Sequence, residues 1–158
     1  MRAARIDRFG GPEELYVTTD APVPEPVRGE ALVRVLAAGT NPLDYKIRDG
    51  SSGVAKKMRP EDFPLTLGRE ACGVIEKLNG EARGLEVGQL VFGMPSLTHR
   101  SGCYADYAAL PVNCLARVPQ GADPTVFGGT ALVLSTALTA AYDQGKVRRG
   151  EKVLVHGG

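Results

Sequence analysis

The fold is decided by residues 30–39, which read Glu-Ala-Leu-Val-Arg-Val-Leu-Ala-Ala-Gly. Apolar side chains alternate with others in this segment, and that pattern predicts a strand buried on one side, which the glycine at position 39 ends. Three further segments have a similar pattern, residues 71–78, 89–92 and 103–109. Short strands at this spacing indicate a barrel or a sandwich.

A helical region follows these strands. Asp123 and Pro124 are typical of a helix start, with Asp as the N-cap and Pro at the first helical position. An apolar run continues from there to Asp143, but Gly128 and Gly129 lie inside it. Each glycine weakens a helix by about 1 kcal/mol relative to alanine. We therefore expect one imperfect helix or two short ones.

The last eight residues, 151–158, read Glu-Lys-Val-Leu-Val-His-Gly-Gly. A short apolar strand running into Gly157 and Gly158 is how a dinucleotide-binding βαβ unit begins, but holding a pyrophosphate takes further glycines and a helix N-terminus. We therefore expect this chain to have little nucleotide affinity by itself. An unpaired apolar strand at 153–155 invites pairing with another chain, so we expect a disordered tail or docking onto a second copy, as a homo-oligomer.

Composition excludes several classes of function. The chain has 158 residues, 43% of them hydrophobic, and a net charge of +1, which fits one buried core. Basic residues are scattered, and this argues against nucleic acid as a partner. The longest apolar region, residues 131–141, is too short and too interrupted by hydroxyl side chains for a membrane span.

Cysteine usage and the N-terminus indicate the compartment. Cys72, Cys103 and Cys114 form an odd set without a Cys-x-x-Cys pair, which argues against a disulfide framework. Residues 1–7 carry too much charge for the apolar core of a signal peptide. We therefore expect a reducing, cytoplasmic location.

Three segments carry a family resemblance, residues 39–50, 63–75 and 137–140. In order and spacing they resemble the medium-chain dehydrogenase/reductase superfamily, and residues 9–15 and 153–158 extend the match. The resemblance is closest to the zinc-independent quinone oxidoreductase-like branch. That branch includes the mitochondrial reticulon-interacting oxidoreductases, which have a similar Phe-Pro-Leu-Thr-Leu-Gly-Arg stretch.

The resemblance implies a fold that is mainly β with α. Residues 1–122 would form the GroES-like catalytic domain, a partly open β-barrel, and residues 123–150 the connecting helices. Residues 151–158 would form the first strand and first glycines of a truncated Rossmann domain. In the family, NADPH binds in the cleft between these two domains.

Residue types at the family's metal positions argue against zinc. Where zinc alcohol dehydrogenases have their ligands, this chain has Asn41, Arg69 and Ser135. Catalytic zinc takes about three His, Cys or carboxylate ligands, and these three residues do not supply them. The four-cysteine structural lobe is also missing, because residues 93–104 hold only Cys103. We predict no metal.

Without zinc, the substrate carbonyl must be polarised by hydrogen-bond donors. The resemblance implies that Asn41 and Asp44, with a tyrosine close by, line the nicotinamide and substrate site. Here that tyrosine is Tyr45. An alternative role for Asn41 and Asp44 is a helix cap, and the two roles are compatible.

The resemblance also places cofactor contacts later in the chain. It implies that Thr139 reaches the nicotinamide, although a helical threonine can instead bond to its own backbone. Gly157 and Gly158 would begin the phosphate loop.

Two functions follow from the sequence. In the first, the chain is part of an NADPH-dependent oxidoreductase that transfers hydride to quinones or α,β-unsaturated carbonyls, and it is inactive alone. In the second, the GroES-like domain is a stand-alone interaction or structural module without catalysis.

Overall fold

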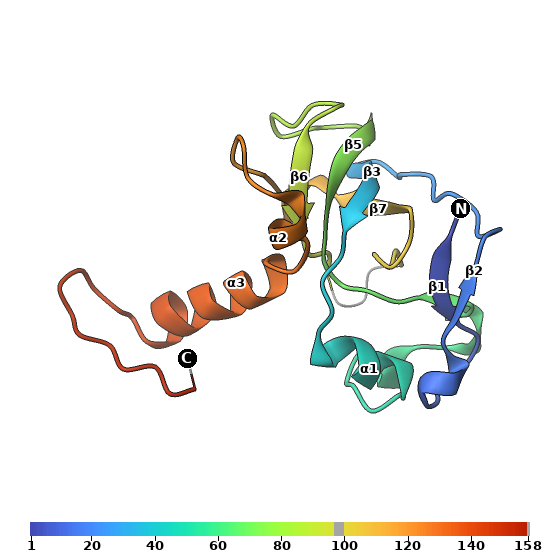
Figure 1. Cartoon of the computed structure of the whole chain (residues 1–158), viewed down its shortest axis with the longest axis horizontal. Coiled ribbons are helices and arrows are strands. Elements are labelled where there is room, and N and C mark those ends of the chain that lie inside the picture. The colour runs from blue at the N-terminus through green and yellow to red at the C-terminus, as the bar shows by residue number, and fades with distance from the viewer. Residues whose placement is uncertain (97–99, 158) are drawn as a thin grey trace.

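A computed structural model describes residues 1–96 and 100–157, and Figure 1 shows their arrangement. The strands form two antiparallel sheets. The smaller sheet has the order β2 (Tyr16–Thr18), β1 (Ala3–Ile6), β4 (Leu65–Thr66). The larger has the order β7 (Tyr107–Pro111), β3 (Glu30–Ala37), β5 (Ala71–Asn79), β6 (Leu90–Gly93), β8 (Leu115–Arg117).

The strands predicted at 30–38, 71–78 and 89–92 are confirmed as β3, β5 and β6. The strand predicted at 103–109 is wrong in its first half, because β7 begins only at Tyr107. Residues before it link the two sheets: the carbonyl of Tyr104 accepts from the Ala4 N–H at 2.8 Å, and that of Asp106 accepts from the Val35 N–H at 2.9 Å. The sheets therefore join at this segment without closing into a barrel.

The helices are short. They are α1 (Pro42–Arg48), α2 (Pro124–Gly128) and α3 (Ala131–Leu138), with a π-helical continuation η5 (Thr139–Gln144). Single 3₁₀ turns are η1 (Pro12–Glu14), η2 (Ala55–Lys57), η3 (Pro60–Asp62) and η4 (Val112–Cys114). No helix in the described ranges is long and apolar enough to cross a membrane.

The expected break in the helical region is confirmed between α2 and α3. Asp123 caps α2, its carboxylate accepting from the Thr125 N–H at 2.8 Å. The reason for Gly128 is packing, since a Cβ there would lie 2.5 Å from the Cβ of Ala37 in β3. The glycine lets α2 lie directly against the end of β3.

Two apolar clusters form the core. The first lies on the larger sheet and includes Val33, Ile75 and Val91. The second holds α1 against the smaller sheet, through Ile47 of the helix and Ile6 of β1. Burial of Ile47 therefore fixes the position of the helix that follows Asn41.

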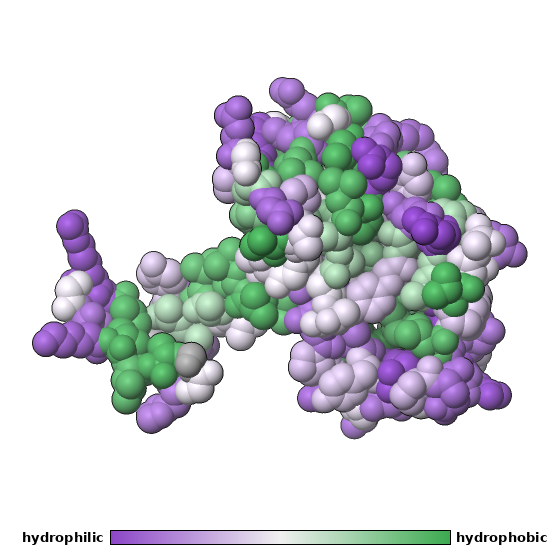
Figure 2. All heavy atoms as spheres, in the orientation of Figure 1, coloured by the Kyte–Doolittle hydropathy of each residue, from purple (hydrophilic) through white to green (hydrophobic). Residues whose placement is uncertain are grey.

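Residues 151–155 form no strand in this chain, and this corrects the prediction of a terminal strand. A strand needs a neighbour for its backbone, and no described segment pairs with this one. Val153, Leu154 and Val155 are 59%, 79% and 71% exposed. Figure 1 shows α3 and the residues after it extending away from the sheets, and Figure 2 shows apolar side chains on their surface.

Candidate functional site

A pocket of about 360 Å³ lies beside the first turns of α1. It is lined by residues at the start of α1 and by two residues from later segments of the chain, namely Thr40, Asn41, Pro42, Asp44 and Tyr45 with Leu67 and Tyr104. Arg48 and Leu15 complete it. Its volume is at the lower end for small-molecule sites, which run from about 300 to 1,000 Å³.

Asn41 and Asp44 stand together at the start of α1. Asn41 is the N-cap, in an extended conformation, and Pro42 follows in the first helical turn. The Asp44 carboxylate accepts from the Asn41 backbone N–H at 2.8 Å. The capping alternative is therefore present in the structure, and both residues also line the pocket.

The Asn41 side chain contacts a buried carboxylate. Its Nδ2 donates to Oε1 of Glu70 at 2.7 Å. An amide nitrogen carries two protons, so one N–H and the amide oxygen remain for other partners. Asn41 therefore presents a donor and an acceptor of fixed orientation beside the pocket.

Tyr104 also lines the pocket, and it comes from the segment that links the two sheets. Its hydroxyl donates to Oδ2 of Asp44 at 2.8 Å, and its oxygen lies 3.2 Å from the carbonyl oxygen of Gly39. Burial, with the hydrogen bond to Asp44, raises the pKa of Tyr104. The phenol therefore remains protonated at neutral pH and keeps its donor role.

Asp44 is an acid in a dry environment. Only 6% of its surface is exposed, and burial raises its pKa although the bonds from Asn41 and Tyr104 and the charge of Arg69 oppose the shift. Its Oδ1 is buried with no hydrogen-bond partner among the residues that the structure describes. Arg69 is fully buried, and burial lowers the pKa of its guanidinium.

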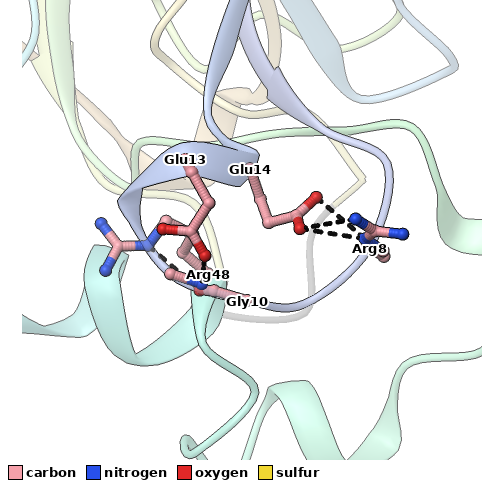
Figure 3. Close-up of polar contacts among 6 residues, drawn as sticks. Arg8, Gly10, Glu13, Glu14 and Arg48 are labelled. Carbon is pink, nitrogen blue, oxygen red and sulfur yellow. Dashed lines mark hydrogen bonds and ion pairs between the residues drawn. The ribbon is translucent and has the colours of Figure 1, made fainter.

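Tyr45 lies on the pocket wall but is 48% exposed. Its neighbour on the rim, Arg48, is tied to the N-terminal loop: Arg48 Nε donates to the Gly10 carbonyl at 3.4 Å, and its own carbonyl accepts from the Gly10 N–H at 2.9 Å. In Figure 3 the same loop carries a two-point contact of Arg8 with the Glu14 carboxylate. The rim is thus held by the loop, while Tyr45 reaches solvent.

The later candidates are not brought to this pocket. Thr139 begins the π-helical turn, is exposed and does not line the pocket. Gly157 is exposed, with a positive φ of 76° that suits glycine. Gly158 lies outside the described residues. Among residues 1–96 and 100–157, no three His, Cys, Asp or Glu side chains are grouped so that they could hold a metal ion.

Sequence reasoning missed two contacts of this site. Tyr104 donates to Asp44, and Glu70 accepts from the amide of Asn41. Neither contact has a local signal, because 60 residues separate Tyr104 from Asp44 and 29 separate Glu70 from Asn41. A Tyr following a buried Cys in a predicted strand reads as an ordinary core residue.

Comparisons with known proteins agree with this fold. Residues 27–120 match the family model of the alcohol dehydrogenase GroES-like domain. The chain is similar to a quinone oxidoreductase of Pongo abelii, with 36% identity over 99% of this chain and 45% of the relative. It is also similar to a mitochondrial NAD(P)H oxidoreductase of Drosophila melanogaster, with 34% identity over 89% of this chain and 35% of the relative.

Solved structures give the same result. A quinone oxidoreductase from Coxiella burnetii matches with a TM-score of 0.83 and 31% identity, over 96% of this chain and 47% of the other. A mycobacterial protein complexed with NADPH matches with a TM-score of 0.79 and 30% identity, over 100% and 46%. The chain therefore spans about half the length of the relatives it matches.

Proposed function

Because the chain belongs to the alcohol dehydrogenase GroES-like family, in the medium-chain dehydrogenase/reductase superfamily, we propose that it forms the substrate-facing part of a zinc-independent oxidoreductase. The reaction we propose is hydride transfer from NADPH to quinones or α,β-unsaturated carbonyls. The similarity to quinone oxidoreductases supports this reaction class.

The observation that carries the proposal is the convergence of Asn41, Asp44 and Tyr104 at one pocket. Two of these side chains come from the N-cap and the first turn of α1, and the third comes from the segment that links the sheets. Side chains so constrained by hydrogen bonds need little reorganisation when charge develops on a bound molecule.

The pocket suits a nicotinamide ring or a small carbonyl compound rather than a whole dinucleotide. Its volume is about 360 Å³, and the oxygen of the Asn41 amide can accept from the carboxamide N–H of a nicotinamide. NADPH, when bound, supplies the hydride. The relative solved with NADPH supports this cofactor, and we propose Thr139, Gly157 and Gly158 as later contacts to it.

Reduction of a quinone or enone leaves negative charge on the carbonyl oxygen, which then takes a proton. We assign the remaining N–H of Asn41 to that oxygen, where a donor in a dry site stabilises the charge most. Tyr45 lies on the pocket wall and reaches solvent, so we assign proton delivery to its phenol. Asp44 and Tyr104 hold the first turn of α1 in place.

The test is quinone-dependent oxidation of NADPH by the protein that joins this chain to a nucleotide-binding domain like that of its relatives. We expect turnover that a zinc chelator leaves unchanged, and a kcat about a hundredfold lower in Asn41→Ala. The 158-residue chain by itself is expected to be inactive, since it would bind NADPH weakly. Loss of turnover with the chelator, or full activity in Asn41→Ala, contradicts the proposal.

A further inference from the structure

Glu70 has a buried carboxylate that accepts two separate hydrogen bonds. Only 1% of its surface is exposed. Oε1 accepts from Asn41 Nδ2 at 2.7 Å, and Oε2 accepts from the backbone N–H of Leu132 at 2.8 Å. Leu132 lies in the first turn of α3. One side chain, directly before β5, therefore joins the pocket amide to the start of α3.

The space for this carboxylate depends on Gly39. A Cβ on Gly39 would lie 2.3 Å from Oε1 of Glu70 and 2.6 Å from Cα of Gly129. No real side chain tolerates such contacts without movement of its neighbours. The chain just after β3 and the turn before α3 thus approach closely because position 39 lacks a side chain, and the carboxylate lies beside it.

The chemistry of a carboxylate suits both contacts. Its two oxygens accept and never donate, so it can take an amide N–H on one side and a backbone N–H on the other. The first N–H groups of a helix have no partner within the helix, and negative charge there is favourable. A carboxamide in the same place offers one acceptor and a donor, and it satisfies only one of the two sites.

We propose that Glu70 is a positioning residue for Asn41. By binding one proton of the amide it fixes the side-chain rotamer, and so directs the second N–H and the amide oxygen of Asn41. Through Leu132 the same carboxylate links that orientation to the position of α3. The catalytic part of this inference rests on the role of Asn41 in the proposed function.

The variant that tests the inference is Glu70→Gln, because it keeps the size of the side chain and removes one acceptor. Its control is Glu76→Gln, in the strand β5 that follows Glu70, because the Glu76 carboxylate is exposed and pairs with Arg34. NMR of the 158-residue chain reports the Asn41 side-chain amide directly. In the wild type we expect two separate Nδ2 proton signals, one of them protected from exchange, and in Glu70→Gln we expect that protection to be lost or sharply reduced.

A second variant keeps the charge. Gly39→Ala displaces Glu70 without changing it, and should likewise reduce the protection of the Asn41 amide, whereas Gly53→Ala has open space and should not. Unchanged protection in both Glu70→Gln and Gly39→Ala overturns the inference. If Glu70→Gln does not fold, Gly39→Ala decides.

Kinetic measurements distinguish a role of Glu70 in positioning Asn41 from a role in stability of the fold alone. In the active protein we expect Glu70→Gln to lower kcat about tenfold with little change in the KM for NADPH, because a misdirected donor affects the transition state. A change in KM alone contradicts a positioning role. If Asn41→Ala retains full activity, the proposed function fails, while the NMR result still decides whether Glu70 orients Asn41.

Discussion

The phenol of Tyr104 donates a hydrogen bond to the carboxylate of Asp44 at 2.8 Å, although 60 residues separate them in the chain. The bond connects the segment between the two sheets to the first turn of α1. It therefore ties together two residues that line the pocket and come from distant parts of the chain.

Tyr104→Phe removes this bond and leaves a buried carboxylate oxygen with one donor fewer. We expect the free energy of unfolding to fall by about 1.5–3 kcal/mol, as for a hydrogen bond to a charged group, in chemical denaturation. Tyr142→Phe is the control, because Tyr142 is 65% exposed. The pKa of Asp44, followed by NMR of its carboxyl carbon, should rise further in Tyr104→Phe, because that bond lowers it. An unchanged Asp44 signal would contradict the geometry.

The raised pKa of Asp44 should determine how one part of the free energy of unfolding changes with pH. Burial raises its folded-state pKa above the ordinary value of 3.8, so protonation favours the folded state. This contribution is fully present below pH 3.8 and is lost as the pH rises through the raised pKa. The free energy of unfolding of Asp44→Asn, relative to wild type, should therefore increase across that range and then level off.

Asp106 provides the matched comparison with the opposite sign. Its hydrogen bonds from Arg2 lower its pKa, so its contribution is present above pH 3.8 and is lost as the pH falls through the lowered pKa. As the pH falls, the free energy of unfolding of Asp106→Asn should therefore rise relative to wild type. That of Asp44→Asn should fall relative to wild type over the acid range. Parallel curves for the two variants would show that burial of Asp44 is not the dominant effect.

Gly128→Ala sets helix propensity against packing. Alanine would favour the helix by about 1 kcal/mol, but its Cβ would lie 2.5 Å from that of Ala37. Overpacking costs about 1–3 kcal/mol, so we expect a net loss of stability in thermal or chemical unfolding. Gly53→Ala, which meets nothing within 4 Å, should change stability little. A more stable Gly128→Ala would mean that α2 does not pack on β3 as described.

Because residues 153–155 are exposed, substitutions there should affect association between chains more than the free energy of unfolding. Leu154→Ser alters a side chain that is 79% exposed, so the free energy of unfolding should change by less than about 0.5 kcal/mol. Leu110→Ala, in the core at 1% exposure, should cost about 2–5 kcal/mol. If the tail pairs with a second copy, sedimentation velocity should show concentration-dependent association that Leu154→Ser weakens. A wild-type chain that stays monomeric at all concentrations contradicts that pairing.

Local patterns were sufficient for β3, β5 and β6 of the larger sheet and for the start of α2. Alternation in residues 30–38 predicts β3, and the Asp123-Pro124 pair predicts the start of α2, because both signals lie within a few residues. The strands β2 and β4 have three and two residues, too few to show alternation. They form because long-range pairing with β1 supplies their hydrogen bonds.

The candidate site divides in the same way. Asn41, Asp44 and Tyr45 lie in one short stretch, and a family resemblance was enough to single them out. Tyr104 and Glu70 reach the site only through the packing of distant segments. In residues 151–155 the outcome is the opposite. Their apolar pattern predicts a strand, but no strand forms because no neighbouring strand in the described part of the chain pairs with their backbone.

The central claim is that this pocket receives the nicotinamide ring and the reacting carbonyl compound. The most direct measurement is chemical-shift mapping of the isotope-labelled chain with nicotinamide mononucleotide, and separately with hydroquinone kept reduced under argon. We predict that both perturb the backbone signals of Thr40, Asn41, Asp44 and Leu67, and that Asn41→Ala weakens the response. Shifts confined to other surfaces, or none at millimolar ligand, would contradict the account.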